Sequence, residues 1–214
     1  MFWYDHIMDT LEKIKSKLFK AVLTSDLREW SLEALEDLRL QVGGLDIPAI
    51  TLFKGEADIA LREFNSFCDH LILQELTEKG SETARTHEKV EKALALKFAL
   101  FHESQSVTLA IVKYLSHPLR LRLALDLQWQ TLNKIWYYAG DRATDFNYYS
   151  KRALLGYIYK TTFIFWLRHR HQDLDDTLSF MQKRFKDVAL DPQAKNFLKE
   201  KVLFMKSMIL KRSP

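Results

Sequence analysis

The histidines are the first side chains to test for chemistry, because imidazole serves both as a metal ligand and as a general base. The seven histidines are His6, His70, His87, His102, His117, His169 and His171. None has a glutamate three residues before it and no His-Glu-x-x-His occurs, so the residue pairs that hold di-iron or catalytic zinc centres are missing. His169 and His171 stand two residues apart, which points them to different faces of a helix, and we interpret them as loop or surface residues.

Other motifs of enzyme active sites are also missing from the sequence. The six glycines form no Gly-x-Ser-x-Gly, no phosphate-binding loop and no Gly-x-Gly-x-x-Gly. The single cysteine, Cys68, excludes a disulfide framework and every multi-cysteine zinc or iron–sulfur site. Asp173, Asp175 and Asp176 fit the start of a helix, where carboxylates are favoured. The sequence therefore predicts a protein that is not an enzyme and that holds no cofactor or metal.

The composition indicates which elements must position any functional side chain. Of the 214 residues, 47% are apolar and 28% are charged, which is typical of a globular protein. Six glycines and four prolines supply few turns for a β protein, whereas the strong helix formers are plentiful. We expect a single all-α domain of nine to ten helices. Its parts are predicted to be a helix-turn-helix-like region at 1–70, a helical core at 71–190 and an amphipathic helix at 191–214.

The first 70 residues show the spacing of a helix-turn-helix. Ser31 is a predicted N-cap of a short helix that Gly43 ends, and Asp46 is predicted to cap a third helix over 47–53. A short helix in that position would enter the major groove of DNA. Residues 31–70, however, hold three basic and eight acidic side chains, a net charge of −5, whereas DNA affinity depends on Lys and Arg at phosphates. We predict a vestigial module that binds no nucleic acid.

The last 22 residues have the opposite charge balance. Residues 193–214 hold six basic side chains and one acidic one, a net charge of +5, and one helical face gathers apolar residues. The residues predicted to contact a membrane are Phe197, Leu198, Lys199, Lys201, Val202, Met205, Lys206 and Ile209. Such a helix can lie on an anionic bilayer. The alternative is a terminal helix that docks on the domain and exposes its basic face to solvent.

Aromatic side chains are densest between residues 129 and 166. Most of them are expected in the core, since aromatic residues dominate helical interiors. Tyr148 and Tyr149 are adjacent, so one of them is expected near the surface with Trp136 as an interface anchor. A helical domain this apolar can also enclose a lipid pocket. Its candidate lining residues are Phe98, Phe101, Leu125, Trp129, Leu132 and Ile158.

The stretch from Trp136 to Ala153 resembles the Coq-nine family of ubiquinone biosynthesis proteins. The resemblance is carried by the motif Ala-Gly-Asp-x-x-Thr-Asp-Phe-Asn at residues 139–147, and it extends over roughly residues 30–190. Three features depart from the family pattern. Tyr148 stands where relatives often have Trp, the basic run 168–171 stands where relatives tend to have an acidic turn, and Leu178 replaces a common Trp.

The resemblance implies a fold similar to TetR-type regulators, without DNA binding, and a cavity that holds quinone intermediates. It also implies a membrane-touching C-terminal helix and a partner, the demethoxyubiquinone hydroxylase. The family is an accessory rather than a catalyst. Its hydroxylase-binding patch, carried over by motif, falls on Ile135, Trp136, Asp145, Tyr148 and Tyr149. Analogy with the regulator fold implies a possible homodimer through the C-terminal half.

The function that we expect is a lipid-binding accessory protein that presents an isoprenoid quinone intermediate to the hydroxylase. The N-terminus has no signal or transit peptide pattern, and the longest apolar run, 153–167, is too short for a span. We therefore expect a cytoplasmic protein that is peripheral on the inner membrane. Two alternatives stay open: a TetR-type ligand-responsive transcription regulator, and a purely structural helical scaffold.

Overall fold

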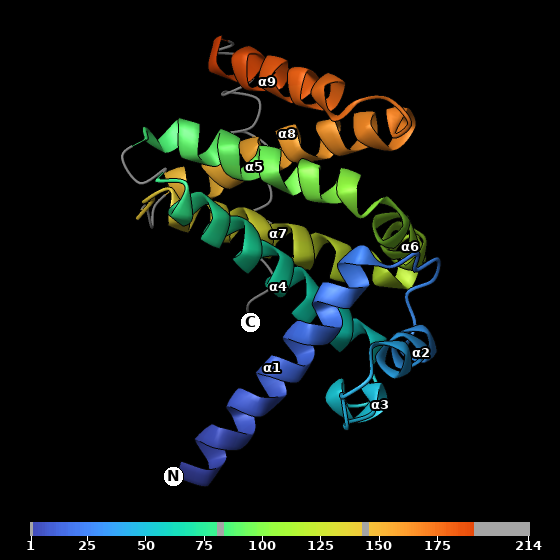
Figure 1. The fold of residues 1–214 in the computed structure, drawn as a ribbon. Helices are drawn as coiled ribbons and strands as arrows, with labels where there is room; N and C mark the ends of the chain where they lie inside the picture. The colour runs from blue at the N-terminus through green and yellow to red at the C-terminus, as the bar shows by residue number, and fades with distance from the viewer. Residues whose placement is uncertain (1, 81–83, 143–145, 191–214) are drawn as a thin grey trace, which may run out of the picture. The chain divides into compact units, whose positions relative to one another are not determined.

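A computed structural model describes residues 2–80, 84–142 and 146–190 (Figure 1). The helices, in chain order, are α1 (Phe2–Thr24), α2 (Leu32–Val42), α3 (Ala49–Leu52), α4 (Ala57–Glu78), α5 (Thr86–Glu103), α6 (Gln105–Leu115), the short 3-10 helix η2 (Pro118–Arg120), α7 (Leu121–Tyr138), α8 (Phe146–His169) and α9 (Leu174–Leu190). No strand occurs in these three ranges, which confirms the predicted all-α class. The predicted helix over residues 191–214 lies outside them.

The chain divides into two compact units, each described here by itself. The first unit comprises residues 1–71 and 103–127, and the second comprises residues 72–102 and 128–214. The three boundaries fall within helices: 71/72 inside α4, 102/103 at the last residue of α5 and 127/128 inside α7. The helices α4 and α7 therefore contribute several residues to both units. The predicted functional division of the chain at residues 70 and 190 stays a prediction.

In the first unit, α2 begins and ends where local sequence signals predict. The Ser31 hydroxyl accepts a hydrogen bond from the Ala34 N–H at 3.1 Å, which satisfies one of the free donors of the first turn. The helix stops at Gly43, whose φ of 66° is a conformation that glycine adopts without a steric cost. Both predictions, the N-cap and the glycine stop, are confirmed.

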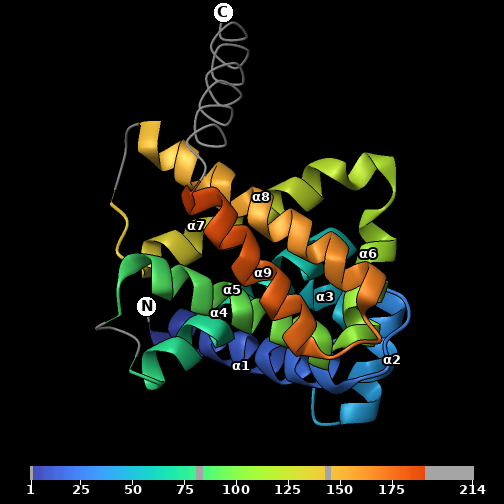
Figure 2. The same cartoon turned by 90° about the horizontal axis from the view of Figure 1, so that it is seen from above.

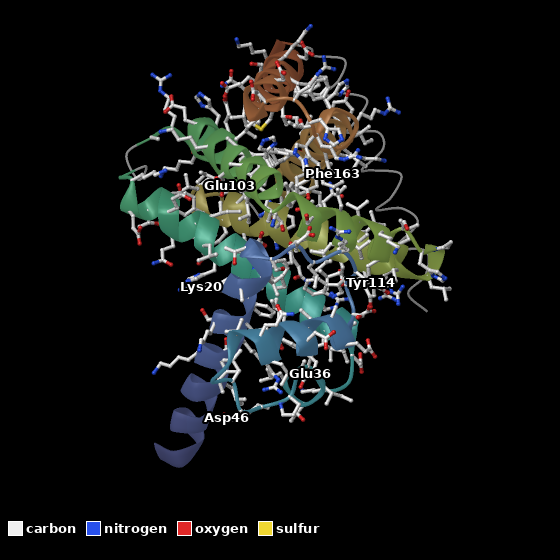
Figure 3. All side chains as sticks on the ribbon, turned by 45° about the vertical axis from the view of Figure 1, so that its right-hand side comes forward. Lys20, Glu36, Asp46, Glu103, Tyr114 and Phe163 are labelled. Atoms are coloured by element: carbon white, nitrogen blue, oxygen red, sulfur yellow. The ribbon has the colours of Figure 1, made fainter. Side chains whose placement is uncertain are left out.

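The third helix differs from its prediction over 47–53. α3 begins only at Ala49, and Asp46 is not its cap. Instead, the Glu36 carboxylate of α2 accepts a hydrogen bond from the Ala49 N–H at 2.7 Å, while Arg39 Nη2 donates to the other Glu36 oxygen at 2.7 Å. The Arg39 bond, followed by the Ala49 bond, lowers the pKa of Glu36. Figure 3 labels both Glu36 and Asp46. The predicted cap was wrong because the capping carboxylate comes from the preceding helix.

Stacked aromatic rings form the interior of the first unit. The ring of Phe19 on α1 lies 5.7 Å from that of Phe53 and 5.5 Å from that of Phe64 on α4. Trp30 packs 5.2 Å from Phe64, and its indole N–H donates to the Ala57 carbonyl at 3.1 Å. These rings are buried, so α1, α3 and α4 share one apolar interior.

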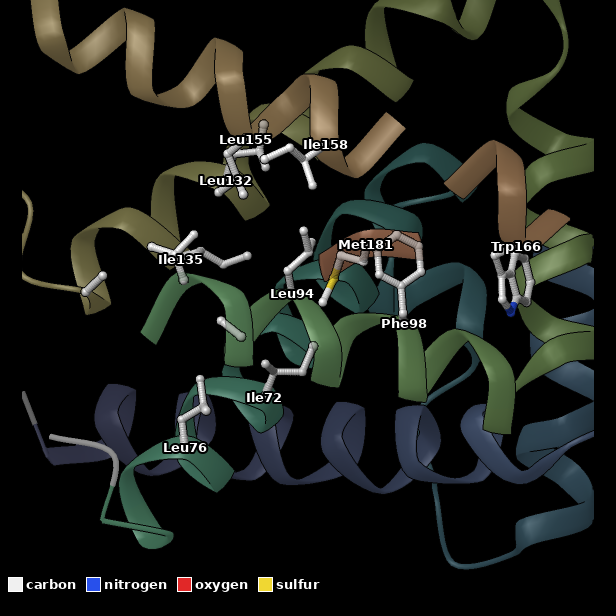
Figure 4. Packing of buried hydrophobic residues seen from close by; sticks show 13 residues of the cluster. Ile72, Leu76, Leu94, Phe98, Leu132, Ile135, Leu155, Ile158, Trp166 and Met181 are labelled. Atoms are coloured by element: carbon white, nitrogen blue, oxygen red, sulfur yellow. The ribbon is translucent and has the colours of Figure 1, made fainter. Parts of the chain in front are cut away.

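The second unit has its own core, built by α4, α5, α7, α8 and α9 (Figure 4). Its buried residues are Ile72, Leu76, Val90, Ala93, Leu94, Phe98, Leu132, Ile135, Ala139, Leu155, Ile158, Trp166 and Met181. α8 and α9 run side by side (Figure 2). α7 and α8 approach closely at Gly156, where an added Cβ would lie 3.2 Å from Leu132 Cδ1. The ends of α7 and α8 near residue 140 carry the candidate site.

Candidate partner-binding surface and adjoining groove

The structure places four of the five predicted hydroxylase-binding residues on α7 and α8. Ile135 is buried in the core of the second unit, whereas Trp136 and Tyr148 are half-buried and Tyr149 is 45% exposed. Asp145 lies outside the described residues. Ile135 therefore supports this surface from below, and the aromatic residues form it.

A third aromatic side chain joins the two tyrosines. The rings of Tyr148 and Tyr149 lie 5.0 Å apart, and the ring of Trp129 lies 6.3 Å from the first and 6.4 Å from the second. Trp129 is 37% exposed. The sequence predicted Trp129 as a residue that lines a lipid pocket. The structure places it beside Tyr148 and Tyr149, the two tyrosines predicted to bind the hydroxylase. We call Trp129, Tyr148 and Tyr149 the aromatic triad.

Beneath the triad lies a buried ion pair that the sequence reasoning missed. Arg152 on α8 is 3% exposed, and its Nη1 donates to the Asp141 carboxylate at 3.1 Å. Lys151 Nζ donates to the other Asp141 oxygen at 2.7 Å. Asp141 follows the end of α7, so the pair joins the last turn of α7 to the first turns of α8. The available signal was Asp141 itself, the acidic residue of the family-like motif.

Arg152 also holds Tyr148 in place. Its guanidinium lies 3.5 Å from the centre of the Tyr148 ring, and its Nη1 donates to the Tyr148 carbonyl at 2.9 Å. Its Nε donates to the side-chain oxygen of Asn133 at 2.5 Å, and the Tyr148 hydroxyl donates to the same oxygen at 2.8 Å. One buried cation therefore fixes both the ring and the hydroxyl of an aromatic residue of the surface.

A groove of about 790 Å³ adjoins the triad within the second unit. Its lining residues are Leu73, Gln130, Asn133, Lys134, Tyr137, Tyr138, Asp141, Arg142, Tyr148 and Arg152. The Arg142 guanidinium covers the face of Tyr137 at 4.2 Å from the ring centre. The groove shares Tyr148 with the triad, and most of its polar side chains are hydrogen-bond donors.

The predicted lipid-pocket residues occupy different environments. Phe98, Leu132 and Ile158 are buried in the core of the second unit (Figure 4). Phe101 is half-buried and packs against that core, with its ring 5.8 Å from that of Phe98. Leu125 belongs to the first unit and is 58% exposed. None of these residues lines the groove of the second unit.

The predicted membrane-binding residues, from Phe197 to Ile209, lie outside the described residues. In the part of the chain that is described, no helix has both the length and the apolar character needed to cross a bilayer. His169 ends α8, with its Nδ1 2.9 Å from the Phe165 carbonyl oxygen and its ring stacked on that residue at 4.3 Å. Over the same ranges, no three His, Cys, Asp or Glu side chains converge as metal ligands would.

Comparison with known proteins gives this surface a family context. The COQ9 family model matches residues 121–190, which include all of the triad and most of the groove. Relatives named ubiquinone biosynthesis protein COQ9, mitochondrial, are 26% identical in Homo sapiens and in Rattus norvegicus, each over 74% of this chain. A relative of the same name from Xenopus tropicalis is 36% identical over 33% of this chain and 22% of its own length.

The human and rat matches cover 52% and 53% of those proteins, so the chain spans about half the length of the curated relatives it matches. The region of the family model begins with α7 and ends with α9. These matches confirm the resemblance to the COQ9 family that the motif at residues 139–147 predicted.

Proposed function

We propose that this chain is a non-catalytic, lipid-binding accessory protein of ubiquinone biosynthesis. It binds an isoprenoid quinone intermediate at a membrane surface and presents it to the demethoxyubiquinone hydroxylase. The observation that carries the proposal is the aromatic triad, which is partly exposed, is held by the Arg152 network and lies in the region that the COQ9 family model matches. The relatives are named for ubiquinone biosynthesis, and the regulator alternative gains no support from them.

The triad has the properties of a protein-docking anchor. Trp and Tyr are the residue types that most often dominate interface energies, because a large rigid ring loses little entropy on binding. The Arg152 network holds Tyr148 in one orientation before any partner arrives. Beside the triad, the buried indole N–H of Trp136 has no hydrogen-bond partner in the described part of the chain.

The lipid and membrane parts of the proposal depend on other residues. The isoprenoid tail would bind among apolar side chains around Phe98, Phe101 and Ile158, where burial stabilises binding by about 25 cal/mol per Å² of apolar area. The basic tail, residues 193–214, would hold the protein peripherally on an anionic bilayer. The matched relatives are named mitochondrial, which favours a mitochondrial-type inner membrane or its bacterial counterpart. A homodimer through the C-terminal half belongs to the same proposal.

The partner assignment is tested by measuring the affinity of the purified chain for the hydroxylase. Trp129→Ala and Tyr149→Ala should each weaken binding at least tenfold, as expected for interface anchors. Tyr157→Ala is the matched control, because Tyr157 is an equally exposed aromatic residue of α8 with no ring contact to the triad. All three variants should keep the helical circular dichroism of the parent chain. Equal affinities for the three variants would refute the assignment.

The lipid assignment is tested separately. Native mass spectrometry of the purified chain should show co-purified isoprenoid lipid, and added long-chain quinone should displace it. A chain that carries no isoprenoid and binds no added quinone at any concentration would overturn the lipid-binding part while leaving the hydroxylase contact standing.

A further inference from the structure

Three side chains of the groove, Gln130, Tyr138 and Arg142, carry donors that have no hydrogen-bond partner in the described ranges. The Tyr138 hydroxyl is buried and has no hydrogen-bond partner in the described ranges. There too, the Gln130 side chain makes no hydrogen bond, and the Arg142 guanidinium is held only by the face of Tyr137. A buried hydroxyl without a partner is costly and calls for a specific explanation.

Two acceptor side chains of the groove, those of Asp141 and Asn133, are already engaged. Both Asp141 oxygens accept bonds from Arg152 and Lys151. The side-chain oxygen of Asn133 accepts from Arg152 and Tyr148. A ligand with acceptor oxygens would meet the donors of Tyr138, Gln130 and Arg142, which have no hydrogen-bond partner in the described ranges, whereas the carboxylate of Asp141 and the amide oxygen of Asn133 are occupied.

We propose that this groove binds the oxygen-bearing head group of the quinone, separately from the isoprenoid tail. This inference rests on the proposed function, since it assigns the position of the head group within the same lipid. A benzoquinone ring with alkoxy substituents offers only acceptor oxygens, and its planar face suits a groove that contains three tyrosine side chains. The volume of about 790 Å³ lies in the range of small-molecule sites.

The position of the groove gives the assignment its mechanistic meaning. Tyr148 lines the groove and also belongs to the triad. A head group held there lies at the edge of the surface that docks the hydroxylase, so the reacting ring is exposed at the interface while the tail stays in the apolar core. Arg142 and Tyr137, which also line the groove, are both exposed.

The test uses the full chain and two probes, a tailless dimethoxy-methyl-benzoquinone and the isoprenoid alcohol farnesol. Titration with the tailless quinone should shift the side-chain amide NMR signals of Gln130 and Asn133 and quench the fluorescence of the nearby Trp129. Farnesol should bind without shifting those two amide signals. Binding of farnesol without any binding of the tailless quinone would overturn this inference but leave lipid binding intact, whereas failure of both probes would overturn the proposed function as well.

Two variants and one control sharpen the test. Tyr138→Phe and Arg142→Gln should each lower the affinity for the tailless quinone about 3- to 10-fold, which is the loss expected for one hydrogen bond. Both should leave the affinity for farnesol unchanged. Arg122→Gln, an exposed arginine of α7 outside the groove, should change neither affinity. Tyr138→Phe also removes an unsatisfied buried hydroxyl, so the ligand-free chain should be equally or more heat-stable.

Two results would contradict the head-group assignment. The first is a Tyr138→Phe variant that is more heat-stable than the parent chain but binds the quinone with the same affinity, because the hydroxyl would then make no bond to the ligand. The second is a titration in which inorganic phosphate shifts the same amide signals and displaces the quinone. The groove would then recognise an anion through its arginine and lysine side chains.

Discussion

Arg152 shows how one buried cation can organise an exposed surface. Its bonds reach Asp141, Asn133 and the Tyr148 carbonyl, and its guanidinium stacks on the Tyr148 ring. A buried charge of this kind is tolerated only because its donors are satisfied. The sequence reasoning selected Tyr148 and Tyr149 from their residue types. It did not select Arg152, because no local pattern pairs this arginine with Asp141 before the chain folds.

Arg152→Met should therefore destabilise the chain by about 3 kcal/mol, because the buried Asp141 carboxylate would lose its buried cationic partner. It should also weaken hydroxylase binding by freeing Tyr148. Urea unfolding followed by circular dichroism measures the first effect, and near-ultraviolet dichroism reports the loosened aromatic rings. Arg168→Met, an exposed change near the end of the same helix, should stay within about 0.5 kcal/mol of the parent. A neutral Arg152→Met would refute this account of the ion pair.

Tyr114 in the first unit makes a second contact that can be tested at single-residue resolution. Its hydroxyl donates to the Asp58 carboxylate at 2.6 Å, and Arg120 stacks on its ring at 3.8 Å. Burial, followed by the bond to Asp58, raises the pKa of Tyr114 from 10.0 to about 12. The neutral phenol is the stabilising form, so its contribution is complete below pH 10 and is lost as the pH rises through 12.

Tyr114→Phe should cost about 1 kcal/mol of unfolding free energy at pH 8, the value of one hydrogen bond. The difference in unfolding free energy between the parent chain and the variant should shrink between pH 10 and pH 12. In that range the unfolded parent ionises Tyr114 while the folded parent keeps it neutral, and this favours unfolding of the parent. Urea unfolding of both chains at pH 8 and pH 11 checks this, and the variant itself controls for the titration of other groups. A difference that grows with pH would contradict the assigned sign.

At the scale of elements, the sequence predicts a helix boundary when the capping residue lies next to that helix, and it does not when the capping residue comes from another helix. Ser31 and Gly43 act within their own helix, so their roles could be predicted from sequence. The start of α3 depends on Glu36, a residue of another helix, and no local pattern points to it. The same reason explains the groove, whose polar lining residues follow no apolar periodicity and meet only after α7 and α8 pack together.

The two candidate caps of this region make opposite predictions. Ser31→Ala should destabilise the chain by about 1 kcal/mol, because it removes the acceptor of the Ala34 N–H. Asp46→Ala should change stability by less than about 0.5 kcal/mol, because Asp46 is exposed and caps no helix. Thermal unfolding of both variants measures the contrast. A larger loss for Asp46→Ala than for Ser31→Ala would restore the cap that the sequence predicted.

At the scale of the whole molecule, composition predicted the helical class but not the division into two units. The three unit boundaries fall within continuous helices, α4, α5 and α7, where neither glycine nor proline interrupts the apolar spacing. A domain boundary is usually recognised by such an interruption, so sequence reasoning had no signal for it. Charge, by contrast, is additive along the chain. The contrast between −5 over residues 31–70 and +5 over residues 193–214 is therefore visible without a structure.

The net charge of +5 over residues 193–214 predicts that these residues bind an anionic membrane. Deleting them removes six basic side chains and one acidic one, and each base near an anionic bilayer contributes on the order of 1 kcal/mol. Sedimentation with vesicles that contain anionic lipid should show at least a tenfold loss of binding for the truncated chain. Vesicles of neutral lipid should bind both chains weakly, and added salt should weaken the parent because it screens the attraction. Hydroxylase binding should survive truncation, since the triad lies on α7 and α8. If the tail instead docks on the domain, truncation will lower the unfolding temperature and leave vesicle binding unchanged.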